Sequence, residues 1–359
     1  MGSVRNEGTI TVSEGSEGIS FFSNNESAGN TTVNVTGDIT NTGAISSTGD
    51  GIRFRTSASG TGSAGITVGG GLINTGTIQS TSDGRGIYVG AGTTITNGIT
   101  NSGTIQGAGT NPYAIYVDDG ASVPRIDISG DSARLAGDVQ AANSALTVSG
   151  QSDGNWFASE GSFAVDSFTI GSGGAFRISN SGHTILATNG FSNQGKLKVS
   201  AGVTARITGN YTQTGAGVYV TEVDVEDGAI TYGTLAVSGD VDLNALAVDV
   251  SGDAGQFLAA SGENTVIGTV LTYSGTSLGA SGITVEDNSE YLDFTAVDSQ
   301  GNIGLTATPN QTYVEESAEK ALGALTGAAS ESIMAETVSF GGGLERAETG
   351  VVKTAFLAT

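Results

Sequence analysis

The sequence predicts an all-β chain wound into a right-handed, three-sided parallel β-helix with a C-terminal cap and a short α-helical tail. Three observations support this prediction: a repeated apolar-x-Asn-x-Gly-x-apolar pattern, a second apolar pattern that keeps pace with it, and glycine-rich turns between them. A chain of stacked, equivalent strand-turn units presents a long lateral surface instead of one enclosed pocket. We therefore expect its function to depend on surface contact.

The first pattern marks a corner of the expected coil. Asn and Gly both tolerate left-handed backbone angles, and an Asn amide can bond its own backbone around a bend. Neighbouring strands of a sheet lie about 4.8 Å apart, so asparagines at equivalent corners can stack. The copies are Ile39, Asn41, Gly43 and Ile45; Leu72, Asn74, Gly76 and Ile78; Ile99, Asn101, Gly103 and Ile105; and Phe191, Asn193, Gly195 and Leu197. Asn41, Asn74, Asn101 and Asn193 are predicted to form a structural corner ladder.

The second pattern places an isoleucine at Ile19, Ile52, Ile87 and Ile115, each followed two residues later by another apolar residue. Successive isoleucines are 33, 35 and 28 residues apart, and the variation falls in polar loops. A third apolar pattern lies between the other two, at Val33 and Val35, Ile66 and Val68, Ile95, and Ile126 and Ile128. Alternating apolar residues are typical of short strands, so three strands are expected in each turn.

Composition narrows the class of protein further. The chain has 58 glycines and 3 prolines in 359 residues, and its glycines follow no collagen period. Its net charge of −23 argues against a nucleic-acid partner, because binding to phosphate backbones requires cationic side chains. It has no cysteine, which excludes disulfides and thiolate metal sites. We expect no cofactor and no metal.

The pattern changes character near residue 209. Tyr211, Gln213, Gly215 and Gly217 form a motif that resembles the junction strand near the C-terminal end of pertactin-like autotransporter passengers. Residues 234–246 resemble that family's strand-glycine-strand ladder. The resemblance covers roughly residues 30–310 and is more specific from residue 209 onward.

The resemblance implies a domain organisation and a location. Residues 1–208 would be the passenger repeats, 209–308 an autochaperone-like cap that templates folding, and 309–340 a helical linker with apolar residues at helical spacing. Residues 341–359 would be a flexible tail or the start of a translocator. The protein would be exposed on the bacterial cell surface or secreted, with an outer-membrane β-barrel in the full-length protein.

Candidate catalytic residues are few. His183 is the only histidine, and no nucleophile or orienting acid can be assigned to it from the sequence. Gly130, Asp131 and Ser132 superficially resemble a serine-hydrolase motif. However, Gly-Asp is this chain's habitual turn dipeptide and alanine follows Ser132. We interpret His183 as an ordinary loop or strand-edge histidine and Ser132 as part of a turn.

Two groups of acidic residues are candidates for a calcium site, and three arginines with one aspartate are candidates for a catalytic groove. Calcium could bind carboxylates, but the spacing fits no defined calcium loop, so solvated turns are preferred. A side groove of the kind used by solenoid polysaccharide lyases is the other possibility. The calcium candidates are Asp118 and Asp119, and Glu286, Asp287 and Glu290; the groove candidates are Arg53, Arg55, Arg85 and Asp83.

Arg53, Tyr88 and Tyr116 are the candidate binding residues, because they occupy equivalent outward positions of the second pattern. An aromatic and basic stripe suits contact with protein or carbohydrate, although cross-strand packing explains it equally well. We expect a non-enzymatic adhesin or self-association scaffold whose partner is a surface protein or glycan of a host or neighbouring cell, or another copy of itself. The alternatives are a β-helix surface hydrolase or lyase, and a filament or surface-layer subunit.

Overall fold

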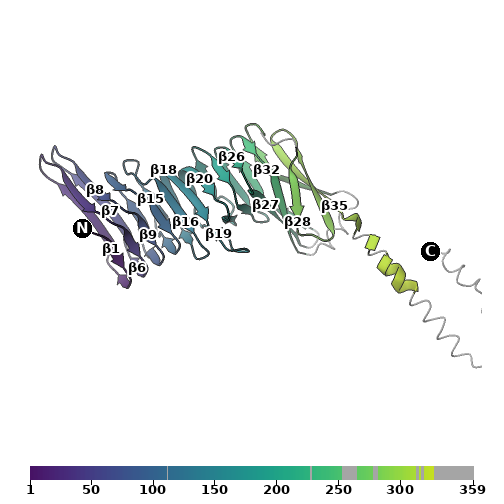
Figure 1. Cartoon of the computed structure of the whole chain (residues 1–359), viewed down its shortest axis with the longest axis horizontal. Helices are drawn as coiled ribbons and strands as arrows, with labels where there is room; N and C mark the ends of the chain where they lie inside the picture. Colours follow the sequence, from purple (N-terminus) through teal and green to yellow (C-terminus); the bar gives the residue numbers. More distant parts are fainter. Residues whose placement is uncertain are drawn as a thin grey trace, which may run out of the picture. The chain divides into compact units, whose positions relative to one another are not determined.

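A computed structural model describes residues 1–110, 112–226, 229–252, 265–277, 282–312, 315–316 and 319–326. Residues 1–308 form one compact unit, and the chain from Pro309 onward forms a second. The first unit is a right-handed, three-sided parallel β-helix, visible as a stack of short strands between β1 and β35 (Figure 1). The predicted fold class is confirmed.

The first ladder contains the strands that run into the asparagine corners. Its strands pair in parallel, so that Leu72 lies between Ile39 and Ile99. In chain order it consists of β1 (Val4–Asn6), β5 (Ile39–Asn41), β9 (Leu72–Asn74), β13 (Ile99–Asn101), β16 (Arg125–Ser129), β18 (Asp138–Ser149), β20 (Phe163–Ile170), β23 (Phe191–Asn193), β26 (Tyr211–Gln213) and β30 (Val241–Asp242).

The second ladder follows the corner, and Ile78 lies between Ile45 and Ile105 within it. One bridge, from Leu135 to Ser159, joins its two parts. The first part is β2 (Thr9–Thr11), β6 (Ala44–Ser47), β10 (Thr77–Ser80), β14 (Thr104–Gln106) and β17 (Arg134–Ala136). The second part is β19 (Phe157–Ala158), β21 (Ala175–Ile178), β24 (Lys196–Val199), β27 (Val218–Glu226), β31 (Ala245–Gly252) and β33 (Thr284–Asp287).

The third ladder carries the second sequence pattern, with Ile87 between Ile52 and Ile115. Strands β18 and β20 are long enough to belong to the first and third ladders at once. The other members are β3 (Ile19–Asn25), β7 (Ile52–Ala58), β11 (Ile87–Val89), β15 (Tyr113–Val117), β22 (Thr184–Ala187), β25 (Thr204–Thr208), β29 (Thr234–Val237) and β32 (Thr265–Tyr273).

A short fourth ladder is confined to the N-terminal turns and contains β4 (Thr31–Val35), β8 (Ala64–Val68) and β12 (Thr93–Ile95). These turns therefore have four strand segments, because the first pattern bends at its corner and contributes two. The assignment of Ile126 and Ile128 to the third pattern is wrong. They pair with Ile99 and Asn101 of the first ladder, and only a bridge from Thr94 to Ser122 extends the fourth.

Antiparallel strands appear at the C-terminal end of the first unit. β28 (Ala229–Tyr232) pairs with β27, and β35 (Asn302–Pro309) pairs with β32. β34 (Leu292–Asp298) belongs to the same sheet as β35. The parallel ladders pass residue 209 without a break, and the proposed division there between repeats and cap stays a prediction.

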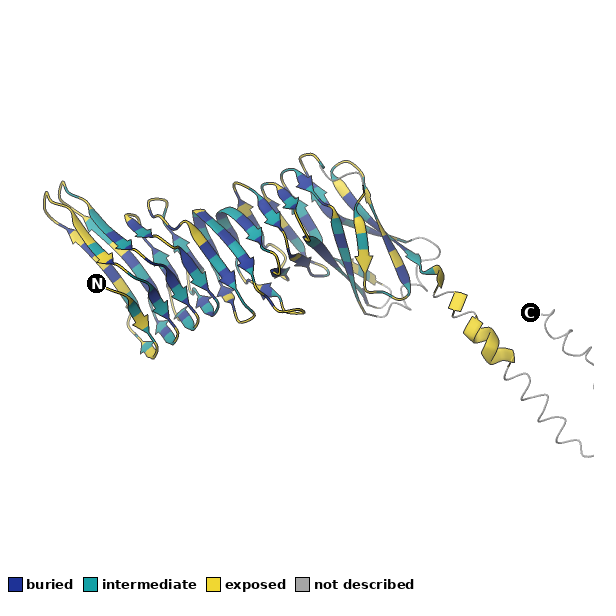
Figure 2. Ribbon diagram, viewed as in Figure 1, coloured by how far each residue is buried: buried dark blue, intermediate teal, exposed yellow. Residues whose placement is uncertain are grey.

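The core is a column of alternate side chains pointing inward, and Figure 2 shows buried and less buried residues alternating along the strands. Each inward Ile or Val fully removed from water stabilises the fold by about 1.5 to 3 kcal/mol. The N-terminal turns are filled mainly by isoleucines. The middle turns contain phenylalanines, and Phe168 stacks on Phe191 at 4.8 Å between ring centroids.

The second unit is helical at residues 311–312, 315–316 and 319–326, and the residues of these helical segments are exposed. The remainder of the expected linker, to residue 340, and the expected tail at 341–359 lie outside the described residues. Within the part that the structure describes, no helix is both long enough and apolar enough to cross a membrane.

Candidate functional site

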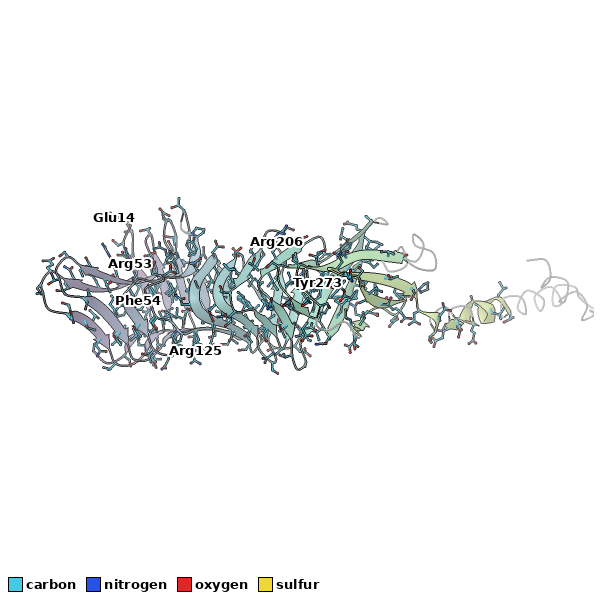
Figure 3. The ribbon with its side chains drawn as sticks, turned by 90° about the horizontal axis from the view of Figure 1, so that it is seen from above. Glu14, Arg53, Phe54, Arg125, Arg206 and Tyr273 are labelled. Carbon is cyan, nitrogen blue, oxygen red and sulfur yellow. The ribbon has the colours of Figure 1, made fainter. Side chains whose placement is uncertain are left out.

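The candidate binding residues lie on the outer face of the third ladder. Arg53, Tyr88 and Tyr116 occupy consecutive strands at the same register position, and the two tyrosine rings are 5.9 Å apart. Their neighbours along each strand, such as Phe54 beside Arg53, point into the core (Figure 3). Alternation along the strand therefore holds these side chains on one outer face.

Arg85 connects the two tyrosines. Its guanidinium carbon lies 4.4 Å from the Tyr88 ring centroid and 4.7 Å from the Tyr116 centroid. Tyr113 packs edge-on against Tyr116 at 5.0 Å, and Arg53 approaches Tyr88 at 5.7 Å. We call Arg53, Arg85, Tyr88, Tyr113 and Tyr116 the tyrosine–arginine surface.

The sequence did not indicate that Arg85 belongs with the tyrosines. It lies in the variable loop before β11, outside the repeated pattern, and its loop position gives no strand register from which to place it. Tyr113 was missed because it lies three residues before Tyr116, and a register shift in β15 separates the two. The folded loop before β11 brings Arg85 onto the surface, and the register shift in β15 brings Tyr113 there.

Carboxylates fix the cations and one tyrosine of this surface. Asp50 is buried, accepts a hydrogen bond from the Arg85 backbone N at 2.8 Å and lies 3.6 Å from Arg53 Nε. Arg53 also pairs with Glu17. Tyr88 Oη donates to Asp118 Oδ2 at 2.7 Å, and burial together with this bond raises the pKa of Tyr88 to about 12. Tyr88 therefore remains a neutral hydrogen-bond donor at physiological pH.

The corner asparagines form a continuous hydrogen-bonded stack. Asn6, Asn41 and Asn74 each donate through Nδ2 to the Oδ1 of the next asparagine at 2.8 Å, ending at Asn101. Asn41, Asn74 and Asn101 also donate to the carbonyl oxygen of the glycine two residues ahead. Each side chain therefore closes its own corner and joins it to the next.

Asn193 does not belong to this stack, contrary to the sequence prediction. Ile128, Val148 and Ile170 occupy the three intervening positions of the first ladder. Asn193 closes its own corner instead, by accepting from the Gly195 backbone N at 3.1 Å. The repeated motif was read correctly as a corner, but the sequence does not show how many turns separate its copies.

Tyr211 and Gln213 form a buried polar group at the next turn. Tyr211 Oη accepts from Asn193 Nδ2 at 3.0 Å and from Gln213 Nε2 at 3.3 Å, and burial raises the pKa of Tyr211 to about 12. Gln213 Oε1 accepts the backbone N–H groups of Asn244 and Ala245. Gly215 has a φ of 61°, and a Cβ on Gly217 would lie 2.1 Å from the Asn193 carbonyl oxygen.

His183 lies inside the solenoid, with its ring 5.7 Å from Phe163 and 5.9 Å from Phe176. Its Nε2 atom is buried without a hydrogen-bond partner, and burial lowers its pKa to about 4. Ser132 lies in an exposed turn, where its neighbour Asp131 accepts from the backbone N and Oγ of Ser152. The structure does not bring His183 and Ser132 together as a catalytic pair.

Four of the other candidates, Asp118, Asp287, Arg55 and Asp83, have local structural partners. Asp118 is occupied by Tyr88 and the Ala91 backbone, and Asp287 accepts from the Ser289 backbone N. Arg55 lies over the Phe22 ring, and Asp83 accepts from Thr110. Among the described residues, no three His, Asp or Glu side chains are arranged to hold a metal ion.

Comparison with known proteins adds nothing to these observations: no protein-family model and no curated protein sequence matches the chain. The functional argument therefore rests on the geometry of the tyrosine–arginine surface and the ladders around it.

Proposed function

We propose that this protein is a secreted or cell-surface passenger of the autotransporter type that acts as a non-enzymatic adhesin or self-association scaffold. The observation that carries the proposal is the tyrosine–arginine surface, where Arg85 lies between Tyr88 and Tyr116 on the outer face of adjacent strands. Tyr and Arg are the residues that most often dominate binding energy at protein interfaces.

The surface is preorganised for contact. Asp50, Glu17 and Asp118 hold the two arginines and Tyr88 in place, so little side-chain freedom is lost on binding. Glu17 and Asp50 balance the charges of the two arginines locally, so the surface offers guanidinium groups and aromatic rings without a large net charge. A partner that offers acidic or hydroxyl groups beside an apolar face matches it, which fits a surface protein or a glycan.

Display of several copies of the protein on one cell would make the contact multivalent. Several molecules on one cell bind several partners at once, and avidity then exceeds the affinity of a single contact. The buried environment of His183, with no hydroxyl or acid bonded to Nε2, favours contact over hydrolysis. For residues 209–308 we propose a role in templating folding, supported by the Tyr211 and Gln213 network that ties successive turns together.

The experiment compares adhesion of beads coated with the full chain to cultured epithelial cells, and clustering of the beads with one another. The double variant Tyr88→Ala with Tyr116→Ala is expected to reduce one of these at least fivefold. Leu186→Ala, an exposed residue of the same ladder, is the matched control and should leave both unchanged. Undiminished adhesion and clustering in a folded double variant would disprove the proposal.

A further inference from the structure

A second candidate site lies in the middle turns, at the corner between the first and second ladders. The corner between β18 and β19 has seven residues, 150–156, where the corner between β5 and β6 has only two, 42–43. The chain's only tryptophan, Trp156, ends the longer corner. This corner loop is absent from the repeated sequence pattern and takes no part in the tyrosine–arginine surface.

The loop is fastened at its base. Asp131 accepts from the Ser152 backbone N and Oγ, both at 2.6 Å. Gln151 is buried, with its Oε1 accepting from the Ala175 backbone N at 3.1 Å and its Nε2 donating to the Gly130 carbonyl at 3.3 Å. These contacts to the turns before and after it give the loop a defined position.

A hollow of about 270 Å³ lies between this loop and the corners of the next turns. It is lined by residues 151–156, 172–175 and 194–196, together with Ala216. Four of its lining residues, Gly154, Gly173, Gly174 and Gly195, have no side chain to fill it. A Cβ on Gly195 would lie 2.1 Å from the Gly174 carbonyl oxygen, so packing between successive corners requires glycine there.

The ring of Trp156 is contacted by the charged side chain of Lys198. Its ring centroid lies 5.9 Å from Lys198 Nζ, and Lys198 in turn pairs with Glu222 at 2.9 Å and with Asp249. Lys198 is almost completely buried, so the ammonium group that contacts the indole is fixed. Trp156 nevertheless remains partly exposed and lines the hollow.

The polar groups at the rim are balanced in charge. Lys196 Nζ lies 3.6 Å from Asp153 Oδ1, and both side chains are more than half exposed, so they can turn toward a ligand. Small-molecule sites combine aromatic side chains with a few placed polar groups, and this hollow offers one aromatic ring with several polar groups around it. A sugar ring offers C–H groups that stack on indole and hydroxyls that bond to carboxylate, ammonium and amide groups.

We propose that this hollow binds a neutral saccharide, with the sugar ring against Trp156 and its hydroxyls bonded to Asp153 and Lys196. A neutral ligand is favoured over an anionic one because the rim carries one charge of each sign and the whole chain is acidic. The site is separate from the tyrosine–arginine surface and does not depend on the function proposed for it.

Because Trp156 is the only tryptophan, the tryptophan emission of the full chain reports on the surroundings of this one side chain. The probes are maltotriose, cellotriose, triacetylchitotriose and, as the anionic comparison, a hyaluronan tetrasaccharide. We expect at least one neutral probe to bind saturably by calorimetry and to change the tryptophan emission. Trp156→Ala should weaken that binding at least tenfold by calorimetry, and Asp153→Ala with Lys196→Ala at least fivefold.

Leu186→Ala, an exposed residue outside both the hollow and the tyrosine–arginine surface, is the matched control and should leave saccharide binding unchanged. Each variant is checked for an unchanged β-sheet circular dichroism spectrum. The proposal is wrong if none of the neutral probes binds, if only hyaluronan binds, or if a folded Trp156→Ala protein binds the neutral probe as tightly as the parent.

Discussion

The N-terminal and middle turns of the β-helix build the same corner in different ways. In the turns with Asn41, Asn74 and Asn101, two residues separate the first and second ladders. In the turns with Ile128, Val148 and Ile170 at that position, the corners have four, seven and four residues. An asparagine amide can close a tight corner by bonding to its backbone, and an aliphatic side chain cannot.

The longer corners rely on backbone hydrogen bonds instead. Gly171 N donates to the Val148 carbonyl at 2.9 Å, and Gly174 N donates to the Gly171 carbonyl at 2.8 Å. The same turns exchange isoleucines for phenylalanines in the core, including Phe163, Phe168 and Phe176. The comparison teaches that uniform turns give a regular lateral face, whereas the interrupted stack leaves room for a loop and a hollow.

The largest effect on stability is expected from adding one methyl group, as a glycine-to-alanine change, in a tight corner. A Cβ on Gly76 would lie 2.0 Å from the Gly43 carbonyl oxygen, so Gly76→Ala forces two stacked corners apart. We expect Gly76→Ala to lower the free energy of unfolding by about 3 kcal/mol.

Gly173→Ala, in a longer corner, is the matched control. A Cβ there meets no atom within 4 Å, and only the φ of 73° opposes it. Its expected cost is about 1 kcal/mol in urea unfolding. Equal costs for the two variants would contradict the distinction between tight and open corners.

The asparagine stack should be the next most sensitive feature. Asn74→Leu keeps the side-chain size but removes the acceptor for Asn41 and the donor for Asn101, both buried. We expect a loss of about 2 to 3 kcal/mol in the free energy of unfolding. Thr75→Ala, at the exposed neighbouring position, should cost far less. A folded Asn74→Leu protein as stable as the parent would show that the stack is dispensable.

The aromatic core of the middle turns predicts a pH effect that the N-terminal turns lack. Burial lowers the pKa of His183 from 6.5 to about 4, so between these values the unfolded chain binds the proton and the folded one does not. Stability is complete above pH 6.5 and falls as the pH drops toward 4.

The expected loss from this histidine between pH 7.5 and 5.5 is about 1.3 kcal/mol. Carboxylates contribute to acid unfolding as well, so the measurement is the difference between the parent and His183→Phe in urea titrations at each pH. The free energy of unfolding of the parent should fall relative to that of His183→Phe as the pH drops. Parallel pH profiles of the two proteins would mean that His183 is not buried in the neutral form.

The smallest effect concerns surface charge in the N-terminal turns. Glu17 pairs with Arg53, and both side chains are partly exposed to water. Glu17→Gln is expected to cost less than about 1 kcal/mol in thermal unfolding, and the cost should fall with added salt. Glu14→Gln, in the adjacent exposed turn, is the control. A larger loss than for Asn74→Leu would reverse the ranking of corners over surface charges.

The sequence predicted the regular part of the fold well. Alternating apolar residues around Ile52, Ile87 and Ile115 specify strands and their inward faces, and Asn-x-Gly specifies tight corners, because both depend on nearby residues. The position of Ile126 and Ile128 was missed, since the choice between two ladders depends on the length of the preceding loop. The contacts of Arg85 and the hollow beside Trp156 depend on how loops of different turns lie against one another.

The central claim is that turns stack along one axis with constant spacing, and distances between spin labels test it most directly. The chain has no cysteine, so labelled cysteines can be introduced in pairs at exposed positions. On the third ladder, Ser20 and Leu186 are six strand steps apart, and Ser20 and Thr208 seven. Strand spacing predicts distances of roughly 29 and 34 Å. Narrow distributions that differ by one strand spacing would support the β-helix, and equal or much shorter distances would contradict it.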